Sequence, residues 1–141
     1  MLGAPIGAEG LGVDPDMTNP DVAQLTIERV HHSHAVVSRV VGELDLASAS
    51  SLRDELNDLV RAGSPVVVDL DGVSFMDSTG LSVMVAGFSR FKERGLDFVL
   101  SRPQAQVLRV LEISGLDRVL TICDSENDAL ERLASSADPG S

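Results

Sequence analysis

The chain has 141 residues, enough for one domain, and 43% hydrophobic with 23% charged residues is typical of a folded protein. Acidic residues outnumber basic ones by 22 to 11, which gives a formal net charge of −11. This balance argues against binding to nucleic acid or to an anionic membrane surface, because both require clustered Lys and Arg.

The two ends of the chain lack a periodic apolar pattern. Gly and Pro are frequent in residues 1–20, so we predict a flexible N-terminal extension there, one domain over 21–134 and a flexible tail over 135–141. The first residues lack the basic segment and apolar run of a signal peptide. No stretch approaches the roughly 18 apolar residues of a membrane span. We therefore expect a cytoplasmic protein.

The first two predicted elements are strands. Leu25 and Ile27 alternate with polar residues, which indicates a half-buried strand. Residues 31–34 are polar and interrupt the apolar pattern, and residues 35–41 form a second run rich in Val. Two strands joined so closely predict an antiparallel hairpin.

A helix is predicted after the hairpin. Apolar residues recur at helical spacing between Leu52 and Val60, and Gly63 is placed to end this helix. Asp45 or Ser48 is available as its N-cap.

Helices and strands then alternate. The apolar run 66–70 is typical of a buried strand, and a second helical stripe extends from Leu81 to Phe91, ended by Gly95. Residues 96–100 predict the next strand.

The C-terminal third repeats this alternation. Pro103 fits the first turn of a helix whose apolar positions run from 107 to 111. Residues 119–122 predict a last strand, and Ser125 is placed to cap a final helix that carries Leu133. The whole order predicts an α/β fold, with a mostly parallel or mixed sheet, an N-terminal antiparallel hairpin and about four helices.

The segment after the third strand is the candidate site, because ligands in such folds collect at the carboxyl ends of parallel strands. Ser78 and Thr79 stand where a helix begins, and a helix start offers unpaired N–H groups and a partial positive charge. The Ser78 hydroxyl could cap that helix or accept a phosphate. Asp77 would oppose the phosphate charge, and Gly80 would keep the hydroxyl approachable. From these residues alone, capping is the more common role.

A longer match adds a second line of argument. The segments 66–70 and 73–81, the latter containing Asp-Ser-Thr-Gly-Leu, resemble the STAS domain of bacterial anti-sigma factor antagonists. The segment 41–45 is similar to the family's Gly-Glu-Leu-Asp stretch. The resemblance covers about residues 22–134.

This resemblance implies a protein that switches partners. In the family, the Ser at the position of Ser78 is phosphorylated by a cognate anti-sigma factor that is itself a serine kinase. The unphosphorylated antagonist binds that kinase and releases its sigma factor, and a separate serine phosphatase restores the binding form. The positions that match the family's motif and its neighbouring loop, and so the expected partner-binding residues, are Asp77, Ser78, Thr79, Gly80, Asp45 and Glu43.

The sequence gives less support to other classes of function. The sequence lacks the Gly-rich phosphate loop and nucleophile motifs of common enzymes, so we expect no catalytic activity and no cofactor. A two-component receiver would need a Lys late in the chain, but Lys92 falls within a predicted helix. The alternative that stays open is a STAS subunit of a larger signalling or lipid-transport complex, without a phosphorylation switch.

Three features resemble reactive or metal-binding groups. His31, His32 and His34 fall in the predicted hairpin turn without ligands nearby in sequence, which favours a solvated turn over a metal site. Cys123, the only cysteine, has no activating His or Lys beside it and is interpreted as a small apolar residue. The acidic residues around Glu126 are interpreted as decoration of a helix start.

Overall fold

The structure is a computed structural model, and it describes residues 25–137. The predicted N-terminal extension, residues 1–20, lies outside the described residues, as does the end of the predicted tail, 138–141. The last helix continues to Ala137, three residues beyond the predicted end of the domain at 134.

Within residues 25–137, five strands and four α-helices follow one another in the predicted order. Their bounds are β1 (Thr26–His31), β2 (Val36–Leu44), α1 (Ala49–Arg61), β3 (Val66–Met76), α2 (Ser78–Glu93), β4 (Phe98–Ser101), α3 (Ala105–Ile113), β5 (Thr121–Cys123) and α4 (Glu126–Ala137). A 3-10 turn, Leu116–Arg118, lies between α3 and β5.

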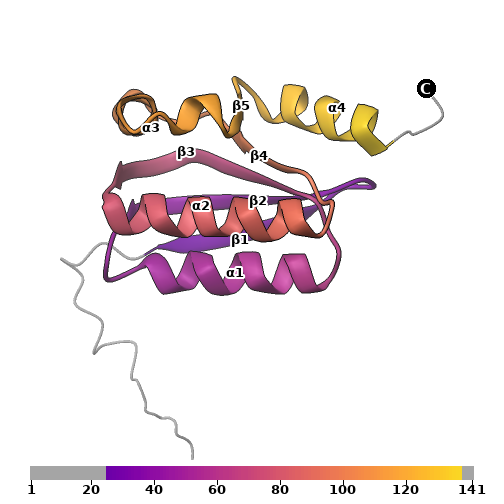
Figure 1. Cartoon of the computed structure of the whole chain (residues 1–141), viewed down its shortest axis with the longest axis horizontal. Coiled ribbons are helices and arrows are strands. Elements are labelled where there is room, and N and C mark those ends of the chain that lie inside the picture. Colours follow the sequence, from indigo (N-terminus) through magenta and orange to yellow (C-terminus); the bar gives the residue numbers. More distant parts are fainter. Residues whose placement is uncertain (1–24, 138–141) are drawn as a thin grey trace, which may run out of the picture.

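The strands form one mixed sheet in the order β1-β2-β3-β4-β5 (Figure 1). β1 and β2 pair in the antiparallel direction, with Val30 opposite Val37, and the remaining neighbours pair in parallel. The predicted α/β fold with an N-terminal hairpin is therefore confirmed. Each parallel connection crosses over through a helix, as parallel pairing requires.

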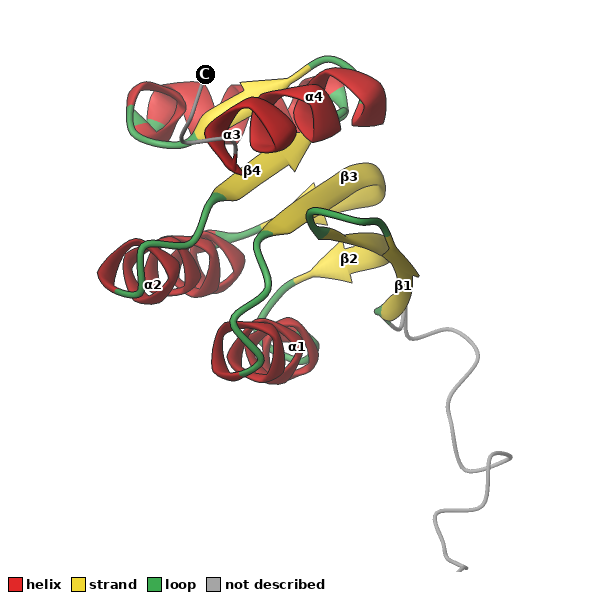
Figure 2. Cartoon of the chain, turned by 90° about the vertical axis from the view of Figure 1, so that its right-hand side faces the viewer, coloured by secondary structure: helices red, strands yellow, loops and turns green. Residues whose placement is uncertain are grey.

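Alternating residues of the central strands separate two apolar layers. Val66 and Val68 belong to the larger buried cluster, with Leu52 and Leu56 of α1, and residues of α2 and α3 complete it. Val67 faces the other way, into a smaller cluster under α4. Figure 2 shows α1 and α2 side by side on one face of the sheet. The period-2 alternation of strand side chains produces this division.

One strand is much longer than predicted. β3 continues from the apolar run 66–70 to Met76, because its second half pairs with the end of β2 across register shifts after Arg39 and Gly42. Gly42 has a φ of 126°, which its lack of a side chain permits. The bulged pairing carries both strands to the same edge of the sheet.

Three other boundaries were wrong. β4 begins at Phe98 instead of 96, because Leu96 N–H closes the end of α2 by donating to the Phe91 carbonyl at 2.8 Å. β5 begins at 121 instead of 119, because the preceding residues close the 3-10 turn. Pro103 lies before the first turn of α3, whose N-cap is Gln104.

Candidate functional site

The loop after β2 and the start of α2 lie beside one another at the carboxyl edge of the sheet. Glu43 is in register with Phe75, and Leu44 with Met76. Just beyond the strands, Asp77 N–H donates to the Leu44 carbonyl at 3.2 Å. The two segments that carry the predicted site residues are therefore joined by backbone hydrogen bonds.

Asp77, and not Ser78, is the N-cap of α2. Its backbone is extended, and its Oδ1 accepts hydrogen bonds from Thr79 N–H at 2.9 Å and Gly80 N–H at 3.0 Å. The capping role considered for Ser78 is thus wrong. A carboxylate is a strong cap here, since it adds negative charge at the positive end of the helix.

Ser78 is left with an exposed side chain at the first position of the helix. Its hydroxyl forms no hydrogen bond with any residue in 25–137, whereas its carbonyl accepts one from Ser82 Oγ at 3.0 Å. Because Asp77 performs the capping, the Ser78 hydroxyl is free for chemistry with another molecule.

Gly80 is required by packing, and not by access to Ser78 as the sequence suggested. It is buried, and a Cβ at this position would lie 2.7 Å from the Leu44 carbonyl oxygen and 2.9 Å from Cγ of both Leu44 and Met76. The first turn of α2 therefore approaches the end of β2 too closely for any other residue.

The Asp45 carboxylate organises the loop between β2 and α1. Its Oδ1 accepts hydrogen bonds from Ala47 N–H at 3.1 Å and Ser48 N–H at 3.2 Å. Ser48 occupies the N-cap position of α1, but its hydroxyl donates back to the Glu43 carbonyl at 2.6 Å instead of capping the helix. These bonds hold the loop in a defined shape, and Glu43 and Asp45 remain half-buried beside the start of α2.

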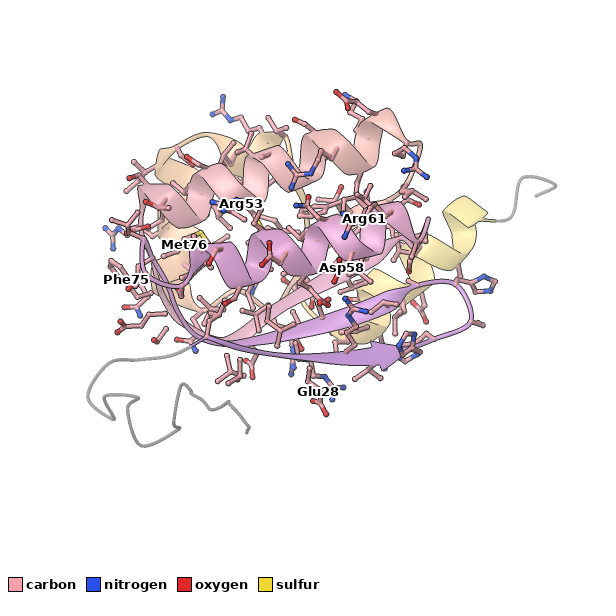
Figure 3. All side chains as sticks on the ribbon, turned by 90° about the horizontal axis from the view of Figure 1, so that it is seen from below. Glu28, Arg53, Asp58, Arg61, Phe75 and Met76 are labelled. Carbon is pink, nitrogen blue, oxygen red and sulfur yellow. The ribbon has the colours of Figure 1, made fainter. Side chains whose placement is uncertain are left out.

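Two large apolar side chains at this edge were missed by sequence reasoning. Leu46 is 79% exposed and Phe75 is 47% exposed. Figure 3 shows Phe75 at one end of the molecule, beside the buried Met76. The sequence carries little signal for them: Leu46 stands between Asp45 and Ala47, before the helical stripe that begins at Leu52, and Phe75 follows Ser74. Exposed apolar groups beside polar ones are typical of protein-binding surfaces.

A second group of polar residues lies on the opposite face, between the sheet and α4. Arg39 of β2 forms a two-point pair with Glu126, with distances of 2.9 and 3.0 Å. Arg102, after β4, donates to both carboxylate oxygens of the buried Asp69, at 2.6 and 3.3 Å. Arg102 also lies 3.6 Å from Glu126, so the pairs form one network. Glu126 is therefore a structural link between α4 and the sheet, and the interpretation as helix-start decoration was incomplete.

The network perturbs the carboxyl group at the start of α4. The hydrogen bonds that Arg39 donates are the largest cause of a lowered pKa of Glu126, which is about 2. The positive charges of Arg39 and Arg102 also lower this pKa. In turn, the hydrogen bonds to Glu126 raise the pKa of Arg39, and the bond to Asp69 raises that of Arg102. Glu126, Arg39 and Arg102 are consequently charged at neutral pH.

The histidines and the cysteine that the sequence singled out lie where a structural role accounts for them. His32 and His34 are exposed in the turn after β1, and His31 ends that strand, so the predicted solvated turn is confirmed. In residues 25–137, no group of three or more His, Cys, Asp or Glu side chains is placed to hold a metal ion. Cys123 is buried, as its interpretation as an apolar residue predicted, and loss of hydration raises the pKa of its thiol.

The part of the chain that the structure describes contains no helix that is both long and apolar enough to cross a membrane.

Comparison with known proteins identifies the family of this chain. The model of the STAS domain family matches residues 26–129. An anti-sigma F factor antagonist of Paenibacillus polymyxa is 31% identical over 111 residues, which cover 77% of this chain and 95% of the relative.

Two further similarities agree with that match. An anti-sigma-B factor antagonist of Bacillus subtilis is 31% identical over 98 residues, covering 70% of this chain and 90% of the relative. The crystal structure of an anti-sigma factor antagonist from Mycobacterium paratuberculosis superposes with a TM-score of 0.74 at 25% identity, covering 83% of this chain and 98% of the other.

Proposed function

Because this chain belongs to the STAS domain family, we propose that it is an anti-sigma factor antagonist controlled by phosphorylation at Ser78. The unphosphorylated protein binds a cognate anti-sigma factor, which is itself a serine kinase, and thereby releases a sigma factor. Phosphorylation by that kinase ends the binding, and a separate serine phosphatase restores it. The names of the relatives support the first part of this proposal.

The observation that carries the proposal is the free, exposed hydroxyl of Ser78 at the first position of α2. It lies at the edge that also presents the exposed side chains of Leu46 and Phe75. A kinase can reach such a hydroxyl, and a partner can cover it together with the apolar groups. One surface thus suits both modification and binding.

The local electrostatics explain why a phosphate would act strongly there. The N–H groups of Thr79 and Gly80, which could otherwise bind the phosphate, already donate to Asp77. A phosphate on Ser78 adds about two negative charges beside that carboxylate. It therefore stays at the surface, where a partner must desolvate it. A loss of about 3 kcal/mol weakens binding more than a hundredfold.

The predicted partner-binding residues divide into two groups. Glu43, Ser78 and Thr79 are half-buried or exposed and are proposed to touch the partner. The other three residues are proposed to shape the contact surface. The carboxylates of Asp45 and Asp77 accept backbone hydrogen bonds, and Gly80 is buried.

In this role the chain is a regulator, acting as a substrate of the kinase and not as an enzyme. We propose that the domain, predicted over residues 21–134, extends to the end of α4 at Ala137, and that it acts in the cytoplasm, where sigma factors function. The alternative is a STAS subunit of a signalling or lipid-transport complex that is assembled without phosphorylation.

The direct test is intact-mass analysis of the protein isolated from its host, compared with the Ser78→Ala variant. We expect a phosphate-sized mass increase in the wild type that is absent from the variant. A titration against the host's anti-sigma factor kinase then compares wild type with Ser78→Glu, which we expect to bind at least about tenfold more weakly, since the side chain adds one charge and bulk at the contact. Ser89→Glu is the matched control, since Ser89 is exposed on the same helix three turns away.

Two results would contradict the proposal. One is the absence of phosphorylation in any growth condition, which favours the scaffold alternative. The other is equal binding by wild type and Ser78→Glu, which would remove Ser78 from the contact surface.

A further inference from the structure

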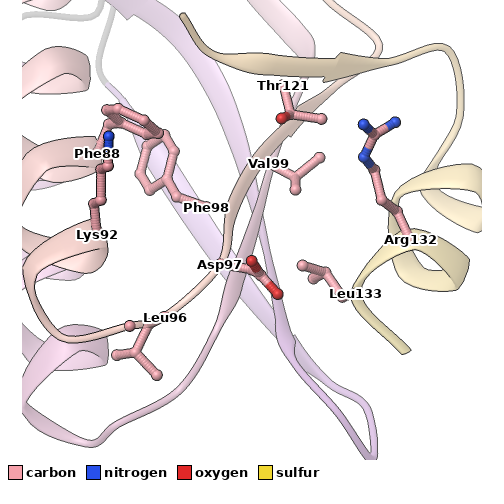
Figure 4. A pocket seen from close by; sticks show the side chains of 10 residues that line it. Phe88, Lys92, Leu96, Asp97, Phe98, Val99, Thr121, Arg132 and Leu133 are labelled. Carbon is pink, nitrogen blue, oxygen red and sulfur yellow. The ribbon is translucent and has the colours of Figure 1, made fainter. Parts of the chain in front are cut away.

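Half of one face of the sheet has no helix over it. The face turned away from α1 and α2 is covered by α4 only near the starts of the strands, where Leu133 and Val99 belong to one buried cluster (Figure 4). The ion pair of Arg39 with Glu126, at 2.9 Å, marks the end of that cover. Beyond it, no helix within residues 25–137 lies over β1 and β2 (Figure 2). Since parallel strands normally have both faces covered, the open part of β2 and β3 is a candidate docking surface.

Two apolar side chains project from this uncovered half of the sheet. Val40 is buried in the larger cluster, so the next residue of β2, Val41, points the opposite way, and it is 52% exposed. Phe75, which is 47% exposed, precedes Met76 of the same cluster and therefore points to the uncovered side as well. Val41 lies over Gly72 of β3, where an added Cβ would come within 2.7 Å of its Cγ2. The surface is thus formed by neighbouring strands with fixed positions.

The chain enters the sheet beside this surface. Thr26, the first residue of β1, pairs with Val41, so the segment 1–24 joins the domain about one strand spacing from Val41. Residues 2–13 are apolar or Gly except for Glu9, whereas the connector that follows, 14–24, contains three Asp. The 11 residues of this connector can span up to about 36 Å. The apolar stretch 2–13 can therefore reach the whole uncovered half of the sheet.

The charges around the surface favour this occupant. Glu28, Glu43 and Asp71 lie around it at exposed or half-buried positions. Arg39 and Arg102, at its border, are already engaged in the ion network. An acidic partner is therefore disfavoured, and so is a second copy of this chain, whose net charge is −11. The stretch 2–13 carries one acidic side chain and is tethered beside the surface, so weak apolar contacts suffice to hold it.

We propose that residues 2–13 dock on the uncovered half of the sheet, with their apolar side chains against Val41 and Phe75. The contact is reversible, because the Gly residues of the stretch lose much conformational freedom when they become ordered. Phe75 also belongs to the surface proposed to contact the anti-sigma factor, so the docked segment competes with that partner. This competition rests on the proposed function, whereas the docking does not.

The docking is tested by paramagnetic broadening in NMR spectra of the full chain, with a nitroxide label on the Ala8→Cys variant. Cys123 is buried, so the label attaches at position 8. We expect the amide signals of Val41 and Phe75 to broaden. A tether alone brings the label near β1, so the result is read against variants that keep the tether and change only the apolar stretch.

The comparison uses the same labelled chain with Ile6→Asp and Leu11→Asp together. Burying two carboxylates in an apolar contact is costly, so the signals of Val41 and Phe75 should recover. Thr18→Asp with Asn19→Asp is the matched control, because it adds the same two charges to the connector and should leave the broadening unchanged.

Two NMR results would overturn the docking. One is equal broadening with and without the changes at Ile6 and Leu11. The other is broadening that weakens on dilution, which would show that a second copy supplies the segment.

The competition is tested by titrating the unlabelled chains against the anti-sigma factor. If the segment is docked about two-thirds of the time, the chain with Ile6→Asp and Leu11→Asp should bind about threefold more tightly than wild type. Equal affinities would overturn the competition. Absence of binding by both chains would contradict the proposed function and the competition together, while the docking is decided by the NMR result.

Discussion

Replacing Glu126 by Gln tests the ion network that joins α4 to the sheet. The variant keeps the shape of the side chain but removes the charge that accepts two hydrogen bonds from Arg39. A folded-state pKa of about 2 instead of 4.5 corresponds to a ceiling of about 3 kcal/mol of stability. Because the Arg39 side chain is 42% exposed, solvent screening reduces this, and we expect a loss of about 1–2 kcal/mol at pH 7.

The lowered pKa of Glu126 also predicts how its contribution to stability changes with pH. The pKa of Glu126 is lower in the folded protein, so its contribution is present above pH 4.5 and is lost as the pH falls toward 2. More than half, about 60%, should be gone by pH 3. The difference between wild type and Glu126→Gln should therefore shrink between pH 7 and pH 3.

The assay is urea unfolding followed by far-ultraviolet circular dichroism, since the chain has no Trp or Tyr to report by fluorescence. Asp128→Asn is the matched control, because Asp128 lies in the same helical turn and forms no ion pair within the described residues. It should cost less than about 0.5 kcal/mol. The reasoning would be refuted if Glu126→Gln lost no more unfolding free energy at pH 7 than Asp128→Asn does. It would also be refuted if the loss caused by Glu126→Gln did not change with pH.

Three further predictions concern local packing, capping and access. Gly80→Ala should destabilise the fold by about 1–3 kcal/mol, because the new Cβ meets a main-chain oxygen. Gly87→Ala should cost less in urea unfolding, because its Cβ meets the end of the Leu56 side chain, which can shift, and no main-chain atom. Asp77→Ala should lose about 1 kcal/mol with its two capping bonds, while Ser78→Ala should stay within about 0.5 kcal/mol of wild type; equal losses would contradict the capping assignment. The Cys123 thiol, buried and with a raised pKa, should react with Ellman's reagent much more slowly in the folded protein than in urea, and equal rates would show that it is accessible.

Much of the architecture was predictable because local patterns and the global fold agree. The apolar run from Val66, the helical stripe from Leu81 and the polar turn at His32 each specify their element without tertiary information. The order of these elements then leaves few topologies, since crossovers between parallel strands are almost always right-handed. The family resemblance rests on equally local motifs.

The candidate site was only partly predictable. The sequence placed Ser78 at a helix start and expected Glu43 and Asp45 nearby, but it could not tell which side chain caps the helix. That choice depends on the extended backbone of Asp77, which the pairing of β3 with β2 imposes. A one-residue difference in where the strand ends decides whether Ser78 is bonded to its own helix or free.

The sequence by itself therefore determined the order of the elements, the apolar faces and the position of the Asp-Ser-Thr-Gly motif, because these depend on neighbours within a few residues. The tertiary structure alone decided contacts between distant segments, such as Gly80 against Leu44 and Arg39 with Glu126, 87 residues apart. Such contacts depend on how strands align and how closely helices approach. No local pattern carries that information, since one residue of register moves every side chain to the other face of the sheet.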